Sequence, residues 1–153
     1  MGNAADLECR RIGPDDRKLM DGLLASGREG GEWFGLESAV NPSGLGEGWG
    51  VFVRGCLCGV AWLRGRPGGK AAEIPALLVA RGWRKTGLSA LLLDQLSRTA
   101  AEAGAVEALI RLDRGAGPGM EEILADAGFA GPNPAGEGRP AGEWRRGLAV
   151  PKG

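Results

Sequence analysis

One stretch decides the fold of this chain, and it reads AEIPALLVARGWRKTGLSALLLDQLSRTAAEA over residues 72–103. Its first part, 72–79, is apolar almost throughout, as is typical of a strand that is covered on both faces. Pro75 lacks the N–H group that a strand ladder needs, so we expect an irregularity there. In the last part, 87–103, apolar side chains recur at the i, i+3, i+4 and i+7 positions of an amphipathic helix. The stretch therefore predicts a strand, a short basic turn and a long helix in direct succession.

The turn itself, RKTGLS at residues 84–89, predicts an anion site. The backbone N–H groups in the first turn of a helix have no partners within the helix and lie at the positive end of its dipole, which favours phosphate or pyrophosphate there. Gly87 lets the backbone approach a ligand closely, Arg84 and Lys85 add positive charge, and Thr86 offers a hydroxyl or a cap. Taken alone, the same residues also fit an ordinary solvated helix start.

The rest of the chain is expected to form short elements around this unit. Strands are predicted at 7–12, 49–54, 56–64, 107–113 and 143–150, and helices beginning at residue 14 and over 120–127. Residues 28–48 are expected to be irregular, with a short helix near 33–39. This order is a mixed α/β arrangement without an internal repeat, so we predict one domain over residues 1–153.

Composition and charge exclude several classes of function. Lys plus Arg and Asp plus Glu number 19 each, so no overall field attracts nucleic acid or an anionic membrane. No apolar stretch approaches the ~20 residues that span a bilayer. The first residues lack the basic start and apolar run of a secretory signal, and three cysteines, an odd number, suit a reducing compartment. We therefore expect a cytoplasmic protein with neither a nucleic-acid nor a membrane partner.

The histidine and cysteine content narrows the possible chemistry further. The chain has no histidine, which excludes Ser-His-Asp catalysis and zinc sites that contain histidine. Cys56 and Cys58 are spaced C-x-C and are expected to share one face of a strand as small apolar residues. No metal site is predicted.

Three features together resemble the central motif of the GNAT N-acetyltransferase superfamily: a strand ending in Leu77-Leu78-Val79, then Arg84-x-x-Gly87-x-Ser89, then leucines at 91–93. Trp83 stands where the family often has an aromatic residue. Residues 123–129, ILADAGF, are similar to the family's next helix, which ends in Gly-Phe. The order of elements agrees over nearly the whole chain.

The resemblance implies a fold and an activity. The fold is a mixed α/β GNAT fold, with a mostly antiparallel sheet of six or seven strands, splayed between the fourth and fifth strands and flanked by about four helices. The activity is transfer of acetyl from acetyl-CoA to the amine of a small molecule or peptide by direct attack in a ternary complex. Homodimers are frequent in the family, so the resemblance allows a homodimer, although the sequence does not determine the oligomeric state.

The resemblance also implies which residues bind the cofactor. The backbone of Leu77, Leu78 and Val79 would line the pantetheine arm. The amides of the turn would bind the pyrophosphate; they belong to Arg84, Lys85, Thr86, Gly87, Leu88 and Ser89. Ser89 departs from the family, which usually has Gly or Ala at that position.

For catalysis, Glu73 is the candidate general base, because many GNAT enzymes place a glutamate on this strand to deprotonate the amine directly or through water. A polar residue at the outer start of the strand is the alternative reading. The chain has no tyrosine, and Leu124 stands where many members carry the Tyr that protonates the leaving thiolate. Catalytic competence is therefore open, and a non-catalytic module that binds acyl-CoA or regulates is the alternative. A nucleotide-binding domain is disfavoured, because G-x-x-x-x-G-K-[ST] is missing.

Residues 28–48 lie where GNAT proteins usually form the acceptor pocket. The segment contains four acidic residues and one basic residue, Arg28, and it also contains the aromatic residues Trp33 and Phe34. The acidic residues are Glu29, Glu32, Glu37 and Glu47. Excess negative charge with aromatic rings suits a cationic amine, so Glu32 and Trp33 are the candidate acceptor residues. A solvated loop with a few core aromatics explains the same composition.

Overall fold

The structure is a computed structural model that describes residues 7–27, 31–35, 47–65, 70–83, 85–112, 119–131 and 143–148. Its strands are β1 Leu7–Arg11, β2 Glu32–Phe34, β3 Glu47–Val53, β4 Cys56–Gly65, β5 Ala71–Glu73, β6 Leu77–Val79, β7 Glu107–Arg111 and β8 Glu143–Gly147. Its helices are α1 Arg17–Gly27, α3 Leu88–Glu102 and α4 Met120–Asp126, with 3-10 turns at Pro14–Asp16 and Arg81–Trp83.

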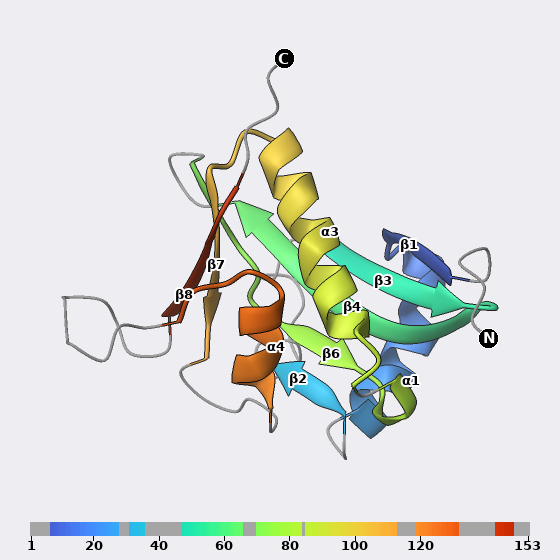
Figure 1. Cartoon of the computed structure of the whole chain (residues 1–153). Helices are drawn as coiled ribbons and strands as arrows, with labels where there is room; N and C mark the ends of the chain where they lie inside the picture. Colours follow the sequence, from blue (N-terminus) through green and yellow to red (C-terminus); the bar gives the residue numbers. More distant parts are fainter. Residues whose placement is uncertain are drawn as a thin grey trace.

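All of the strands belong to one sheet (Figure 1). The order is β1-β3-β4-β5-β7-β8, and β6 lies between β4 and β2. The pair β5–β7 is parallel and the others are antiparallel. The mixed α/β class with a mostly antiparallel sheet is thus confirmed. The described part has eight strands and three α-helices, because one predicted strand is divided and β2 is added.

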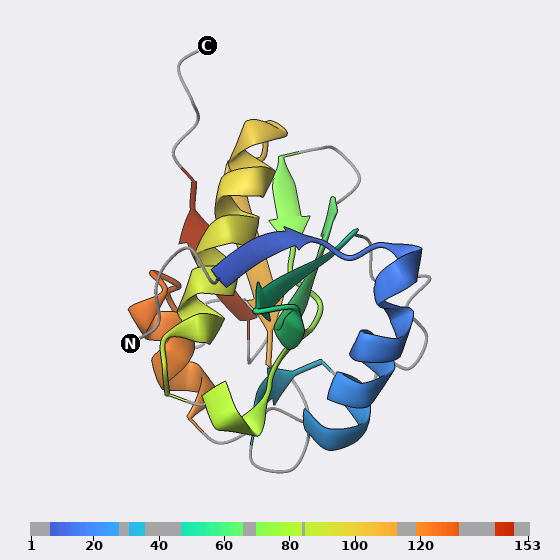
Figure 2. The same cartoon turned by 90° about the vertical axis from the view of Figure 1, so that its right-hand side faces the viewer.

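Helices cover the sheet from two sides (Figure 2). Helix α3 packs across β4, β3 and β7 with α4 beside it, and α1 packs on the opposite face against β4 and β6. The spacing of leucines along α3 explains its placement, since burying each one stabilises the fold by ~1.5–3 kcal/mol. The buried leucines are Leu88, Leu92, Leu93 and Leu96, each at most 4% exposed.

The predicted strand at 72–79 is divided at Pro75. Before the break, β5 pairs with β7, and the Ile74 N–H continues that pairing by donating to the Leu109 carbonyl at 2.9 Å. After the break, β6 pairs with β4 and β2 instead. Strand β4 runs past both pieces, and its Trp62 N–H donates to the Ala76 carbonyl at 3.1 Å. The irregularity expected at proline is confirmed, and it is the point at which the sheet splays.

Two sequence expectations are wrong. The first is an irregular or helical segment around residue 33, because Glu32–Phe34 forms strand β2, antiparallel to β6. Once β6 has parted from β7, its edge carries N–H and C=O groups that need partners, and β2 supplies them. The second is the packing of Cys56, which is exposed beside the turn at Arg54 and Gly55, whereas Cys58 is buried. Residues 28–30 and 36–46 of the predicted irregular segment lie outside the described residues.

Among the residues that the structure describes, no helix combines the length and the apolar character needed to cross a bilayer.

Candidate functional site

The turn between β6 and α3 is wound tightly. Lys85 has a φ of 62° and Gly87 a φ of 87°, so both lie in the left-handed region, which is uncommon for a residue with a side chain. Gly87 is the N-cap of α3, and the Thr86 hydroxyl donates to the Trp83 carbonyl rather than capping the helix. Arg84 lies outside the described residues. The turn thus leads into α3 and leaves the Lys85 N–H group able to donate a hydrogen bond.

That partner is the side chain of Glu32. Its Oε2 accepts a hydrogen bond from the Lys85 N–H at 2.9 Å, and its Oε1 accepts one from the Ser89 hydroxyl at 2.7 Å. Glu32 is 4% exposed and Ser89 1%. A carboxylate at the start of a helix is stabilised by the helix dipole and by charge-assisted hydrogen bonds. The predicted anion site therefore holds an anion, and that anion belongs to the chain itself.

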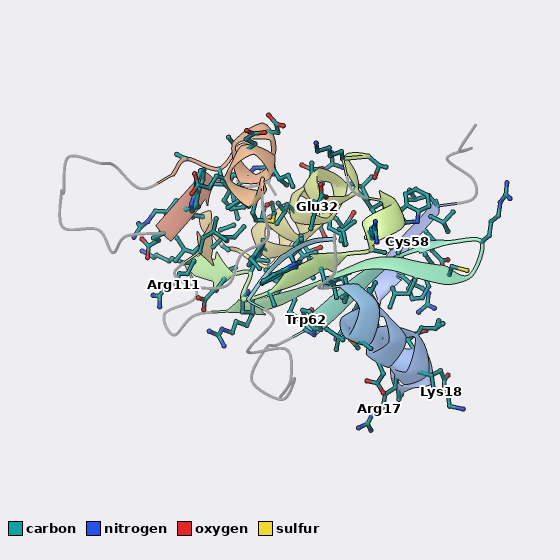
Figure 3. All side chains as sticks on the ribbon, turned by 90° about the horizontal axis from the view of Figure 1, so that it is seen from below. Arg17, Lys18, Glu32, Cys58, Trp62 and Arg111 are labelled. Carbon is teal, nitrogen blue, oxygen red and sulfur yellow. The ribbon has the colours of Figure 1, made fainter. Side chains whose placement is uncertain are left out.

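A hollow of about 420 Å³ opens beside this contact, between β2, the start of α3 and α4. It is lined by Glu32, Lys85, Gly87, Ser89, Ala90, Gly119, Glu122, Ile123 and Asp126. Three of these described side chains are carboxylates and one is an ammonium, so the hollow has a negative balance with Glu32 in place. Figure 3 shows Glu32 on the side of the sheet that carries α3 and α4, opposite α1.

Glu73, at the end of β5, lies in a different setting. It is 6% exposed, and its Oε1 accepts hydrogen bonds from Arg64 at 2.9 Å (Nε) and 2.7 Å (Nη2). The two residues are directly opposite in the β4–β5 ladder. Arg111 Nε lies 3.9 Å from Glu73 Oε2, beyond hydrogen-bonding distance. Arg64 thus fixes the orientation of the Glu73 carboxylate at the end of β5, just before the break at Pro75.

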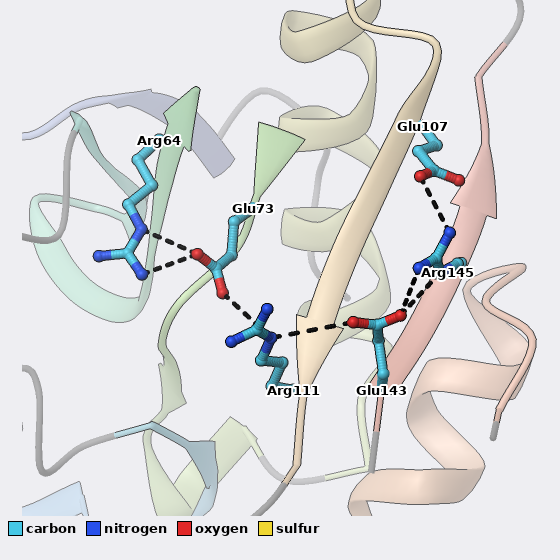
Figure 4. A network of polar contacts seen from close by, with 6 residues as sticks. All are labelled: Arg64, Glu73, Glu107, Arg111, Glu143 and Arg145. Carbon is cyan, nitrogen blue, oxygen red and sulfur yellow. Dashed lines mark hydrogen bonds and ion pairs between the residues drawn. The ribbon is translucent and has the colours of Figure 1, made fainter. Parts of the chain in front are cut away.

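The contact extends into a network of alternating charge across four strands (Figure 4). Arg111 also lies 3.9 Å from Glu143, which is 4% exposed in side chain and is held by Arg145 at 2.6 Å. Arg145 in turn meets Glu107 at 3.2 Å. This network lies on the face of the sheet away from α3, because the strand neighbours Ala72 and Ile74 point into the core beneath that helix. Glu73 and the start of α3 are therefore on opposite faces.

Comparison with known proteins identifies the family. The sequence profile of the Acetyltransferase (GNAT) family matches residues 21–117, which is more than half of the chain. The chain belongs to the GNAT family. The family assigns it to the acyl-CoA-dependent acetyltransferases. No relative among curated proteins matches the chain by sequence.

Solved GNAT structures share the fold at low identity. A GNAT-family protein from Desulfovibrio desulfuricans, described as a putative acetyltransferase, has a TM-score of 0.69 at 16% identity, covering 94% of this chain and 99% of that chain. An acetyltransferase from Salmonella typhimurium that modifies the N-terminal serine of the ribosomal protein L7/L12 has a TM-score of 0.68 at 14% identity, covering 94% and 96%. N-acetylglutamate synthase from Neisseria gonorrhoeae, complexed with coenzyme A and N-acetyl-glutamate, has a TM-score of 0.66 at 18% identity, covering 94% and 35%.

Within the GNAT fold, the predicted acceptor pair Glu32 and Trp33 does not converge. Successive residues of a strand point to opposite faces, so Glu32 faces α3 while Trp33 packs against the apolar cluster beneath α1. The backbone of Leu77–Val79, predicted to line the pantetheine arm, is paired on one edge with β4 and on the other with β2. Leu124 is fully buried in the core, where it packs rather than supplying a proton.

Sequence reasoning missed two contacts of this GNAT site. Pairing of Glu73 with Arg64 was detectable, because Pro-Gly-Gly at 67–69 is a turn signal in the sequence and a hairpin about it is expected to bring residues 64 and 73 close to register. The contact of Glu32 with Lys85 and Ser89 had no local signal, because 53 and 57 residues separate the partners.

Proposed function

We propose that this protein transfers the acetyl group of acetyl-CoA to the amine of a small molecule or peptide. The observation that carries the proposal is the anion site at the start of α3, where the Lys85 amide and the Ser89 hydroxyl hold a carboxylate. A pyrophosphate is bound at a helix start in the same way, by hydrogen-bond donors and by the positive end of the helix dipole. In this proposal the amides from Lys85 to Ser89, with Arg84 beside them, bind the pyrophosphate, and Leu77–Val79 orient the pantetheine arm.

In the reaction, the amine nitrogen attacks the thioester carbonyl, the C–S bond breaks and the coenzyme A thiolate leaves. The amine must lose a proton, and we assign its removal to Glu73, directly or through one water. Arg64 contributes by fixing the orientation of the Glu73 carboxylate at the splay. Because the chain has no tyrosine, the thiolate takes its proton from water. General acid catalysis is typically worth ~10²–10⁴-fold, so we expect slower turnover than in members with that tyrosine.

A second candidate function is a GNAT module that binds acyl-CoA without catalysis. Two observations favour it: the chain contains no tyrosine, and Arg64 already holds the proposed base. Both candidates require acyl-CoA to bind, and they differ in whether an amine then releases the thiol.

Calorimetry with acetyl-CoA, followed by thiol release with a panel of amines, tests the proposal. The panel should include glutamate and a peptide with an N-terminal serine, since fold neighbours act on these or bind their products. We expect binding at sub-millimolar concentration and amine-dependent thiol release. Binding without release from any amine would favour the non-catalytic module. A lack of binding by the wild type and by every folded variant would exclude both.

A further inference from the structure

Strand β2 lies where acyl-CoA would have to bind under the proposed function. It pairs along β6 in the register Glu32 to Val79, Trp33 to Leu78 and Phe34 to Leu77. The other edge of β6 is paired with β4. A pantetheine arm that follows the β6 backbone therefore meets a strand that is already in place.

The side chain of Glu32 occupies the second part of the same path. Its two carboxylate oxygens take the Lys85 amide and the Ser89 hydroxyl, the donors that a pyrophosphate would use. The hollow beside them also carries Glu122 and Asp126. The negative charge of these carboxylates would repel an incoming polyanion, and the two hydrogen-bond donors that it needs are already bonded to Glu32. Both effects oppose binding until Glu32 moves away.

The docking of β2 is specific. Phe34 is fully buried in the core, and Trp33 packs against the cluster beneath α1. Directly after the strand, Gly35 has a φ of 69° and passes so close to the Pro75 carbonyl that a side chain would overlap it. The end of β2 thus lies directly against the break at Pro75. The strand has only three residues, so its backbone pairing is short, and the two hydrogen bonds of Glu32 add to it.

We propose that β2 is an intramolecular plug: backbone and carboxylate of Glu32–Phe34 occupy the acyl-CoA path, and acyl-CoA binds only when β2 leaves β6 and Glu32 leaves α3. This inference rests on the proposed function and adds its regulation. The apparent affinity for acyl-CoA equals the intrinsic affinity multiplied by the fraction of molecules with β2 undocked. Any change that loosens β2 therefore tightens acyl-CoA binding.

Calorimetric titration with coenzyme A tests this dependence in the full chain. Glu32→Ala removes both hydrogen bonds and should tighten binding by on the order of tenfold or more, since hydrogen bonds to a charged group are each worth at least about a factor of ten. Glu122→Ala is the matched control, because it removes a carboxylate from the same hollow without touching the Lys85 amide or Ser89. It should tighten binding by less than about fivefold, which is the upper end of the range for an exposed charge interaction. Equal effects in the two variants would overturn the plug.

Hydrogen exchange gives a readout that distinguishes the plug from the proposed function. Without coenzyme A, the Glu32→Ala variant should exchange faster than the wild type in 31–35 and 77–79 and equally fast in β3. Equal exchange of the two proteins in 31–35 would overturn the plug whatever coenzyme A does. On addition of coenzyme A to the wild type, 31–35 should lose protection, whereas an ordinary binding site gains it. Binding with full protection of 31–35 would overturn the plug alone. A lack of binding by every folded variant would overturn the proposed function as well.

Discussion

Replacing Gly35 with alanine should destabilise the protein far more than the same change at Gly55. Both glycines have positive φ, 69° and 80°, so both substitutions place an L-residue in the left-handed region. They differ in what surrounds them. At Gly55 no atom lies within 4 Å of an added methyl group, whereas at Gly35 the methyl would overlap the Pro75 carbonyl oxygen and lie 3.1 Å from the Ala76 Cα.

The magnitude follows from these surroundings. The left-handed conformation costs an L-residue about 1–2 kcal/mol, and this is the whole effect expected at Gly55. At Gly35 the obstructing atoms belong to the backbone, so no change of rotamer relieves the overlap, and β2 has to shift from β6. Phe34, fully buried beside it, then loses burial worth up to about 3 kcal/mol. We expect Gly35→Ala to lower the free energy of unfolding by about 3–5 kcal/mol.

Urea unfolding of the two variants and the wild type measures this difference. Equal loss of stability at the two positions would refute the tight approach of Gly35 to Pro75, and with it the docked position of β2. If Gly35→Ala leaves too little stability for a full unfolding curve, hydrogen exchange at 31–35 under native conditions gives the same answer. Loss of protection there, with β3 still protected, is the expected result.

Two further predictions concern the charged groups. Glu73→Gln should lower kcat by ~10²–10⁴-fold on any amine that the protein acetylates, as loss of a general base does, whereas Glu107→Gln at the far end of the same network should leave kcat unchanged. Similar kcat values for the two variants would assign Glu73 a structural role. Hydrogen bonds from Arg10 and from the Gly13 amide hold the pKa of Asp16 below its ordinary value, so its stabilising contribution is full above about pH 4 and is lost as the pH falls through the lowered value. In urea unfolding between pH 5 and pH 2, Asp16→Asn should therefore lose less stability with falling pH than the wild type, and parallel curves would contradict this assignment.

Much of the fold was readable because its determinants are local. The leucine spacing of 87–103 predicted α3, and Pro75 predicted the break that divides β5 from β6. In each case the physical cause is a backbone preference or a periodicity confined to neighbouring residues, which a single sequence displays directly.

The tertiary structure alone decided what occupies the anion site. A strand of three residues has no measurable periodicity, and β2 forms because the splay leaves the β6 edge in need of partners, a condition created by β7 and β4 together. Local charge made Glu32 a candidate acceptor residue, and its contacts with Lys85 and Ser89 are visible in the structure alone. The sequence by itself determined a helix start that attracts an anion. Which anion occupies this helix start depends on a contact between residues more than fifty positions apart. Tertiary packing, rather than local preference, determines such contacts.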